Sequence, residues 1–298
     1  MFSKMRSEIK RSRHVYALLA PYMVLFTVFT VIPVAMSIIL SFTYFNMLEM
    51  PRWIGWHNYL VLFLEDEVFI IALKNTFIFA VITGPISYIA CFVFAWMINE
   101  MPRRLRAFMT LLFYAPSISG NIYFMWQLLF SGDSYGYFNG ILMKLGVIFE
   151  PIQWLGDERY ILAVIIVVQL WLSLGISFLA FIAGLQNIDK SLYEAGAVDG
   201  VSNRWQELWY ITLPSMRPML MFGAVMQITG SFAMADVATN LAGFPSVNYA
   251  AHTIVTHLMD YGSIRFEMGY ASAIATVLFI IMLTINKLVQ RMLRKVGD

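Results

Sequence analysis

Short rows of polar side chains recur at helical spacing inside segments that are otherwise apolar. Between residues 160 and 186, Gln169, Ser173 and Ser177 follow one another at intervals of four, so one continuous helix would present all three on one face. Three other apolar segments carry sets that would likewise share a helix face: Tyr114, Ser117 and Asn121; Gln227 and Ser231; Ser272 and Thr276. Amides and hydroxyls bind the hydroxyl groups of polar solutes, but they also join neighbouring helices by hydrogen bonds. Both interpretations stay open for each residue.

Groups for catalysis, metal binding or nucleotide binding are missing from the sequence. The histidines are His14, His57, His252 and His257. The last two are five residues apart rather than four, and no His-Glu-x-x-His sequence occurs, so we predict no metal site. No Gly-x-x-x-x-Gly-Lys-Ser/Thr loop is present to hold nucleotide phosphates. We therefore expect no catalytic residue and no cofactor bound by this chain.

The composition excludes most classes of soluble protein. Of 298 residues, 60% are hydrophobic and only 13% are charged, whereas soluble domains carry about 25% charged residues. A formal net charge of +2 provides no field for nucleic-acid binding, and the single cysteine, Cys91, cannot form an intramolecular disulfide. An integral membrane protein is the class that remains.

Six stretches without Asp, Glu, Lys or Arg are long enough to cross a bilayer. Each must be helical, because hydrocarbon offers no partner for unpaired backbone groups. We predict one all-α membrane domain over residues 1–298, with six spans at about 14–43, 70–99, 107–131, 160–186, 218–236 and 268–290. A seventh uncharged stretch, 237–259, contains many polar groups, and we interpret it as an outside loop with an interfacial or re-entrant segment.

The basic residues predict the orientation of the spans. With the N-terminus in the cytoplasm, 15 of the 20 Lys and Arg residues fall in inside segments and five fall outside. The positive-inside rule therefore favours six spans with both termini cytoplasmic. The charge-free stretches contain no ionisable carboxylate of the kind that ion-coupled transporters keep in the bilayer, and the nearest charged candidates, Lys74 and Asp236, lie at the ends of spans. If this chain moves a solute uphill, the energy is expected to come from a partner.

The inside connection at residues 187–217 is predicted to form two short helices. Ser191 and Glu194 have the spacing of a capping box at the start of the first helix, and Gly200 suits a left-handed turn at its end. The apolar positions of the second, amphipathic helix are Trp205, Leu208, Trp209 and Ile211.

This connection resembles the EAA loop of permease subunits of binding-protein-dependent ABC importers. The resemblance is carried by Glu194-Ala195-Gly196, Asp199-Gly200 and Ile211-Thr212-Leu213-Pro214, although Gly196 stands where the family usually has alanine and the turn after Gly200 is one residue longer. Segments from Ala20-Pro21 to Met268-Gly269-Tyr270-Ala271 are similar to carbohydrate permeases of the maltose and glycerol-phosphate type. This similarity extends over nearly the whole chain.

The resemblance implies a type I ABC importer permease fold in a bacterial or archaeal plasma (inner) membrane. It implies a coupling helix between the fourth and fifth spans that docks on a separate ATPase, which uses ATP and Mg. The residues expected to make this coupling are Glu194, Ala195, Gly196, Asp199 and Gly200. The expected partners are a second homologous permease, a pair of ATPase subunits, an extracytoplasmic solute-binding protein, a sugar or oligosaccharide and the lipid bilayer, but no nucleic acid.

By the same resemblance, the polar rows become candidates for the path of a sugar. The candidate path residues are Tyr114, Ser117, Asn121, Gln169, Trp171, Ser173, Ser177, Gln227, Ser231 and Phe232. Amides and hydroxyls suit sugar hydroxyls, and Trp171 or Phe232 could stack on a pyranose ring. The main alternative function is an ion-coupled secondary transporter of small polar solutes. An integral-membrane enzyme and an assembly protein are two further alternatives.

Overall fold

The computed structural model describes residues 13–120 and 122–294, in which most residues are helical, turns and irregular segments join the helices, and one pair of two-residue strands is present. The chain divides into two compact units. Unit 1 comprises Met1–Glu65 and Leu258–Val277, and unit 2 comprises Asp66–His257 and Leu278–Asp298. The two units are described separately.

Five helical segments are long and apolar enough to cross a membrane. They are His14–Leu40, Glu67–Asn99, Glu158–Gln186, Arg217–Ala242 and Met268–Leu293, and they coincide with five of the six predicted spans. The predicted span at 107–131 instead consists of two helices, α6 (Arg103–Ile118) and α7 (Ile122–Leu129). The break follows Pro116, and Ser119 at the end of α6 has an extended backbone.

Unit 1 begins with a long exposed helix. It consists of α2 (Arg13–Phe26), the π-helical segment η1 (Thr27–Val31) and α3 (Ile32–Leu40). The unit also contains the antiparallel strands β1 (Thr43–Tyr44) and β2 (Arg52–Trp53), the helix α4 (His57–Leu64), the π-helical segment η4 (Asp260–Ile264) and the start of α17 (Met268–Arg294).

Two close contacts fix the turn after α3. The buried Asn58 Nδ2 donates hydrogen bonds to the carbonyl oxygens of Ser41 and Thr43, each at 2.9 Å. The Gly269 amide donates to the Phe45 carbonyl at 3.0 Å, and a side chain at position 269 would collide with the Thr43 carbonyl. Glycine at this position therefore lets the start of α17 approach the backbone of this turn.

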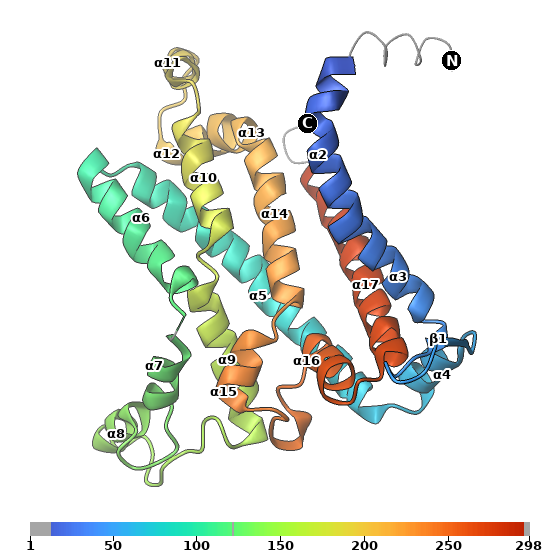
Figure 1. Ribbon diagram of the computed structural model, residues 1–298. Helices are drawn as coiled ribbons and strands as arrows, with labels where there is room; N and C mark the ends of the chain where they lie inside the picture. Colours follow the sequence, from blue (N-terminus) through green and yellow to red (C-terminus); the bar gives the residue numbers. More distant parts are fainter. Residues whose placement is uncertain (1–12, 121, 295–298) are drawn as a thin grey trace. The chain divides into compact units, whose positions relative to one another are not determined.

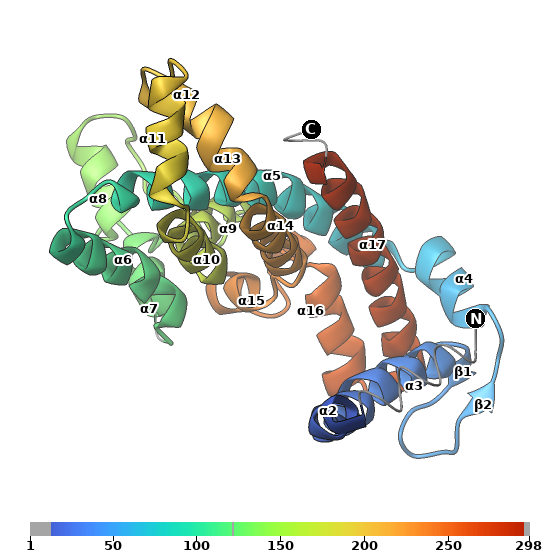
Figure 2. The same cartoon turned by 90° about the horizontal axis from the view of Figure 1, so that it is seen from above.

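Unit 2 is built on α5 (Glu67–Asn99), against which α9 (Glu158–Leu172), α10 (Ile176–Gln186) and α14 (Arg217–Phe232) pack. Its other elements are α6, α7, α8 (Tyr137–Lys144), α11 (Lys190–Val198), α12 (Arg204–Glu207), η2 (Leu208–Thr212), α13 (Leu213–Ser215), α15 (Asp236–Ala242), η3 (Val247–Tyr249) and α16 (Ile254–Met259). Figures 1 and 2 show α10 and α14 side by side along α5. In Figure 1, α11 lies at one end of this unit and α8 and α15 lie at the other.

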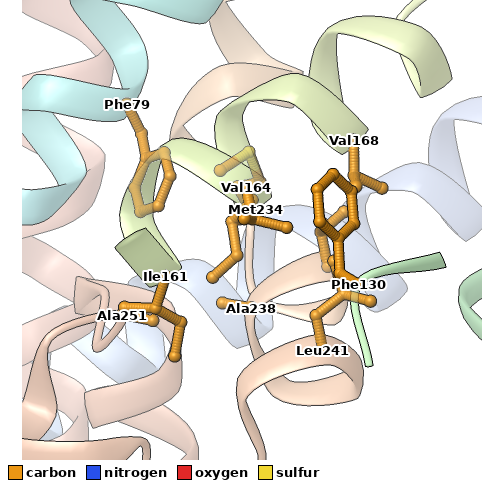
Figure 3. Packing of buried hydrophobic residues seen from close by; sticks show 11 residues of the cluster. Phe79, Phe130, Ile161, Val164, Val168, Met234, Ala238, Leu241 and Ala251 are labelled. Atoms are coloured by element: carbon orange, nitrogen blue, oxygen red, sulfur yellow. The ribbon is translucent and has the colours of Figure 1, made fainter. Parts of the chain in front are cut away.

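One apolar core holds α9 and α15 against α5. Phe79 of α5 and Ile161 of α9 are fully buried and pack with Met234 and Leu241. Figure 3 shows these side chains converging from several helices, with Phe130 at the end of α7 closing the cluster. Burial of such side chains away from water contributes roughly 1.5–3 kcal/mol each. This core fixes the positions of α7, α9 and α15.

Glycine permits the close contact between α10 and α14. A methyl group added at Gly223 of α14 would collide with the ring of Phe181 on α10. We expect Gly223→Val to destabilise the chain by about 2–3 kcal/mol, because the core cannot accept added volume without strain. Thermal unfolding of the purified chain would measure the loss. Gly230→Ala is the control, because nothing lies within 4 Å of the added methyl group, and equal melting temperatures for both variants would contradict the prediction.

A buried polar cluster ties the segment after α15 to α5. His257 Nε2 lies 2.9 Å from Asp66 Oδ2, and His252 Nε2 lies 3.3 Å from His257 Nδ1. Asp66 Oδ1 also caps α5 by accepting the Phe69 amide hydrogen at 2.9 Å. Asn75 Nδ2 donates to the carbonyl of His252 at 3.0 Å. The predicted loop at 237–259 is thus a set of short helical pieces held by specific polar contacts.

Candidate functional site

A cavity of about 210 Å³ lies where the broken segment α6–α7 meets α9, α14 and α15. Its polar wall consists of Ser117, Ser119, Tyr123, Gln169 and Asp236. The break after α6 brings the two serines to the wall, while α7 supplies the tyrosine and α9 the glutamine. The rest of the wall is formed by Pro116, Ile122, Leu172, Gly230, Ala233, Met234 and Val237.

Most of the polar groups in this wall are free to bind a solute. Among the described residues, no hydrogen-bond partner is found for the side chains of Ser119, Tyr123 and Gln169 or for the carboxylate of Asp236. Ser117 Oγ donates to the Tyr114 carbonyl at 2.8 Å but can still accept a hydrogen bond. Amide, hydroxyl, phenol and carboxylate groups therefore converge on one space. Together they can bind a ligand that carries several hydroxyl groups.

The other predicted residues of the fourth segment do not share a helix face with Gln169. Ser173 ends α9 and Gly175 begins α10, so the helix is interrupted between Gln169 and Ser177. Ser173 Oγ donates to the Leu170 carbonyl at 2.6 Å, and the buried Ser177 Oγ donates to the Gly223 carbonyl at 3.2 Å. The row at intervals of four assumed a continuous helix, and in that respect the prediction was wrong.

The Gln227 side chain binds a backbone carbonyl at the interruption between α9 and α10. Its Nε2 donates to the Ser173 carbonyl at 3.2 Å and lies 3.1 Å from Cys91 Sγ. The interruption leaves that carbonyl without its usual helical partner, and it accepts the Gly175 amide hydrogen at 2.8 Å and the Gln227 amide instead. Ser231 Oγ donates in turn to the Gln227 carbonyl at 2.7 Å. Both side chains are buried.

Gln227, Ser231 and Phe232 line a second cavity, of about 360 Å³, whose wall is almost entirely apolar. The remaining members of that wall come from α5, α14 and α17 and include Phe77, Tyr88 and Ile285. The Phe232 ring meets the Phe77 ring edge-on, with centroids 6.0 Å apart.

Trp171 and Tyr114 do not line the polar cavity. The Trp171 ring packs edge-on against Trp126, with centroids 5.3 Å apart. Tyr114 lines another hollow, of about 450 Å³, beside Arg103 and Arg106. Asn121 lies outside the described residues. Ser272 and Thr276 belong to unit 1, where Thr276 Oγ1 donates to the Ser272 carbonyl at 2.7 Å.

The predicted coupling segment contains a helix whose cap differs from the predicted one. Asp189, rather than Ser191, is the N-cap of α11, and its Oδ1 accepts the Ser191 amide hydrogen at 3.0 Å. This hydrogen bond lowers the pKa of Asp189. A lowered pKa means that the cap is present at neutral pH and is lost as the pH falls and the carboxylate becomes protonated. The capping-box prediction was wrong because the helix begins one residue before Ser191.

The glycines of this segment shape its own fold. A methyl group added at Gly196 would lie 2.6 Å from Ile211 Cδ1, so the glycine lets α11 contact η2. Gly200 has a φ of 95° and makes the predicted left-handed turn, which the Val201 amide closes by donating to the Gly196 carbonyl at 2.9 Å. Of the predicted apolar positions, Leu208 and Ile211 are buried, whereas Trp205 and Trp209 are exposed.

The outer face of α11 is free for a partner. Glu194, Ala195 and Asp199 are exposed, and neither carboxylate has a hydrogen-bond or ion-pair partner among the described residues. Leu192 and Val198 add exposed apolar surface, Val198 with 89% of its area accessible. This face combines acidic and apolar groups at the end of unit 2 that lies away from α8 and α15 (Figure 1).

The cavity also contains three polar residues that were not predicted as site residues: Ser119, Tyr123 and Asp236. The helical spacing used to assemble the candidate rows stops at the α6–α7 break, so it could not place Ser119 or Tyr123. Asp236 carries a charge at the end of a predicted span, which is the pattern that could have drawn attention to it.

The long apolar helices define a multi-pass membrane protein. Residues 101–296 match the family described as binding-protein-dependent transport system inner membrane component. The chain belongs to this family, whose members are permease components of ABC importers. This confirms the resemblance to carbohydrate permeases, and the ion-coupled alternative is not favoured.

Relatives and solved structures agree with this placement. The chain is 34% identical to the probable ABC transporter permease protein YesP of Bacillus subtilis (strain 168), over 93% of this chain and 89% of that protein. It is 31% identical to the lactose transport system permease protein LacF of Rhizobium radiobacter, over 96% and 95%. A crystal structure of a bacterial ABC transporter that imports the acidic polysaccharide alginate shares the fold, with a TM-score of 0.76, 23% identity, and coverage of 99% of this chain and 100% of that chain.

Proposed function

We propose that the polar cavity around Gln169 is where this permease holds a sugar or oligosaccharide during ATP-driven import. The observation that carries the proposal is the convergence of unpaired polar side chains on one space in the described residues. Sugar hydroxyls can donate to the Gln169 and Asp236 oxygens and accept from the Tyr123 hydroxyl. The names of relatives that transport lactose or arabinooligosaccharides support a saccharide as the substrate class.

The second part of the proposal is that α11 is the coupling helix. Support comes from its exposed face and from the resemblance of Glu194 to Gly200 to the family loop. A separate pair of ATPase subunits would bind ATP and Mg, hydrolyse the nucleotide and act on α11, while this chain catalyses no reaction. Glu194 and Asp199 would accept hydrogen bonds from donors on the ATPase, with Ala195 and the turn at Gly200 presenting that face.

The full assembly follows from these two parts. This chain would form one permease domain of six spans, the third made of α6 and α7, with both termini cytoplasmic in a bacterial or archaeal plasma membrane. A second, homologous permease would complete the passage. An extracytoplasmic solute-binding protein would deliver the sugar, as the match to binding-protein-dependent transport components suggests. Tyr114, Asn121, Trp171, Ser173, Ser177, Gln227, Ser231 and Phe232 stay predicted path residues, which a solute would meet in another state of the cycle.

The substitution Gln169→Leu tests the binding space. We expect uptake to fall about tenfold, because the leucine removes hydrogen bonds worth about 1–1.5 kcal/mol each without disturbing a protein contact. The measurement is uptake of radiolabelled lactose and arabinobiose by the reconstituted complex with ATP inside the vesicles, together with recovery of the complex on purification.

Gln227→Leu is the matched comparison for this test. It leaves the Ser173 carbonyl without its side-chain donor, so the melting temperature of the complex should fall, whereas Gln169→Leu should leave that temperature unchanged. Undiminished uptake by Gln169→Leu would mean that this residue only packs between helices. Uptake that persists without ATP and collapses with an ion gradient would instead refute import driven by an ATPase.

A further inference from the structure

We propose that Asp236 makes this cavity select uncharged or cationic saccharides over anionic ones such as uronates and sugar phosphates. The inference rests on the proposed function of the cavity and names the class of substrate that it accepts. A permease cavity could in principle hold either kind of ligand. The charge of its wall decides between them.

The carboxylate of Asp236 is available to a ligand. Asp236 is the first residue of α15, is exposed and lines the cavity. Thr239 Oγ1 and Asn240 Nδ2 donate to its backbone carbonyl, at 3.2 Å and 2.7 Å, and so hold the main chain of the turn without occupying the carboxylate. Among the described residues, the carboxylate has neither a hydrogen bond nor an ion pair.

No positive group in the cavity offsets this charge. In the part of the chain that the structure describes, the wall contains no Lys, Arg or His, and its other polar members, Ser117, Ser119, Tyr123 and Gln169, are neutral. Arg159 is paired with Asp157, and Arg204 is paired with Glu100 and Glu207. The carboxylate of Asp236 is therefore the single charged group in the described wall of this cavity.

A single carboxylate interacts differently with neutral and with anionic saccharides. It can accept charge-assisted hydrogen bonds from two neighbouring hydroxyl groups of a neutral sugar. A uronate or phosphate group in the same space meets a like charge with no cation to bind it. At separations of about 6 Å, and with partial screening by water, the repulsion corresponds to about a tenfold loss of affinity.

The alternative role for Asp236 is purely structural, because an acid in the first turn stabilises a helix. The two roles predict different results. If Asp236 is purely structural, its substitution should change the affinities for all ligands to the same degree. If its charge discriminates between ligands, its substitution should change the ratio of the affinities for neutral and anionic ligands.

The test is equilibrium dialysis of the assembled permease–ATPase complex in lipid nanodiscs, without the binding protein. The probes are galactobiose, digalacturonate and the disaccharide of glucosamine, which have similar size and differ in charge.

We expect the wild-type complex to bind digalacturonate about tenfold more weakly than galactobiose, and to bind the glucosamine disaccharide at least as well as galactobiose. Asp236→Asn should bring the affinities for galactobiose and digalacturonate to within about threefold of each other. Glu150→Gln, an exposed acid outside the cavity, should retain the wild-type ratio.

Equal binding of galactobiose and digalacturonate by the wild type would overturn the inference. So would an unchanged ratio in Asp236→Asn, which would leave the residue a structural role only. Failure of all three probes to bind a complex that still imports sugar would also overturn it, because the cavity would not be the saccharide site. ATP-independent import would instead refute the proposed function, so the two failures are distinguishable.

Discussion

Glu194→Lys is expected to lower ATP-driven uptake about 100-fold while leaving the chain inserted in the membrane. The substitution reverses a charge in the middle of the exposed face of α11, where neither Glu194 nor Asp199 has a partner among the described residues. Loss of one member of a desolvated charge pair typically costs 2–5 kcal/mol at an interface. Reversal adds repulsion from the donors that would otherwise bind the carboxylate. The fold of the loop should survive, because its internal contacts involve Gly196, Ile211 and Tyr193 rather than Glu194.

Three measurements separate coupling from folding in this variant. Co-purification of the ATPase subunits and sugar uptake should both fall, and the amount of chain in the membrane should stay at the wild-type level. Glu150→Lys reverses an equally exposed acid between α8 and α9 and should leave all three unchanged. Normal co-purification and uptake with Glu194→Lys would refute the assignment of α11 as the coupling helix.

His257→Leu should cause the largest loss of stability among single substitutions in unit 2. It removes the imidazole bound to Asp66 and leaves a buried carboxylate at the cap of α5 without that partner. Leaving a buried carboxylate with one hydrogen-bond partner fewer typically costs about 1–3 kcal/mol, and more when the group is charged. The contact with His252 is lost as well, so the segment that Asn75 and Thr76 tie to α5 loses part of its anchor. We expect the melting temperature of the complex to fall by about 10 °C.

His57→Leu is the control for this experiment. His57 is exposed at the start of α4, so the same change of side chain should alter the melting temperature by no more than about 1–2 °C. A wild-type melting temperature for His257→Leu would mean that the buried cluster contributes no net stability. The double variant Asp66→Asn, His257→Leu should recover part of the loss, because an uncharged amide is less costly to bury than a carboxylate that has lost the imidazole.

The membrane-spanning helices could be located from the sequence because absence of charge is a local property. Five of the predicted spans coincide with apolar helices of spanning length. The third differs, since the chain breaks between α6 and α7 near Pro116. Whether a proline near a helix end breaks the helix depends on which neighbouring groups can hydrogen-bond the backbone atoms that it leaves unpaired. Those neighbours come from other parts of the chain, so the sequence of this segment alone could not predict the break.

Gln169 and Gln227 show why the site itself was harder to predict. Both are glutamines in apolar helices, with a serine four residues later. The Gln227 amide donates a hydrogen bond to the Ser173 carbonyl, 54 positions earlier in the chain. The Gln169 amide lines the cavity and has no hydrogen-bond partner in the described part of the chain. Only the position of the interruption after α9 distinguishes them.

The fold of the loop at residues 187–217 was easier to predict because its features are close in sequence. The turn at Gly200 and the two-helix form follow from residue types within a few positions. What the local pattern missed was the partner of Gly196. The room that Gly196 leaves is filled by Ile211 of the same loop.

The interruption between α9 and α10 also bears on how the cavity can change shape. At Ser173–Gly175 the helix is interrupted, and the Ser173 carbonyl accepts the Gly175 amide hydrogen at 2.8 Å and the Gln227 side-chain amide at 3.2 Å instead of a regular helical bond. A tilt of α9 at this interruption would displace Gln169, which lies one turn away, without unwinding either helix. Under the proposed function, such a tilt would change the contacts of Gln169 with a solute while only the few hydrogen bonds at Ser173 are remade.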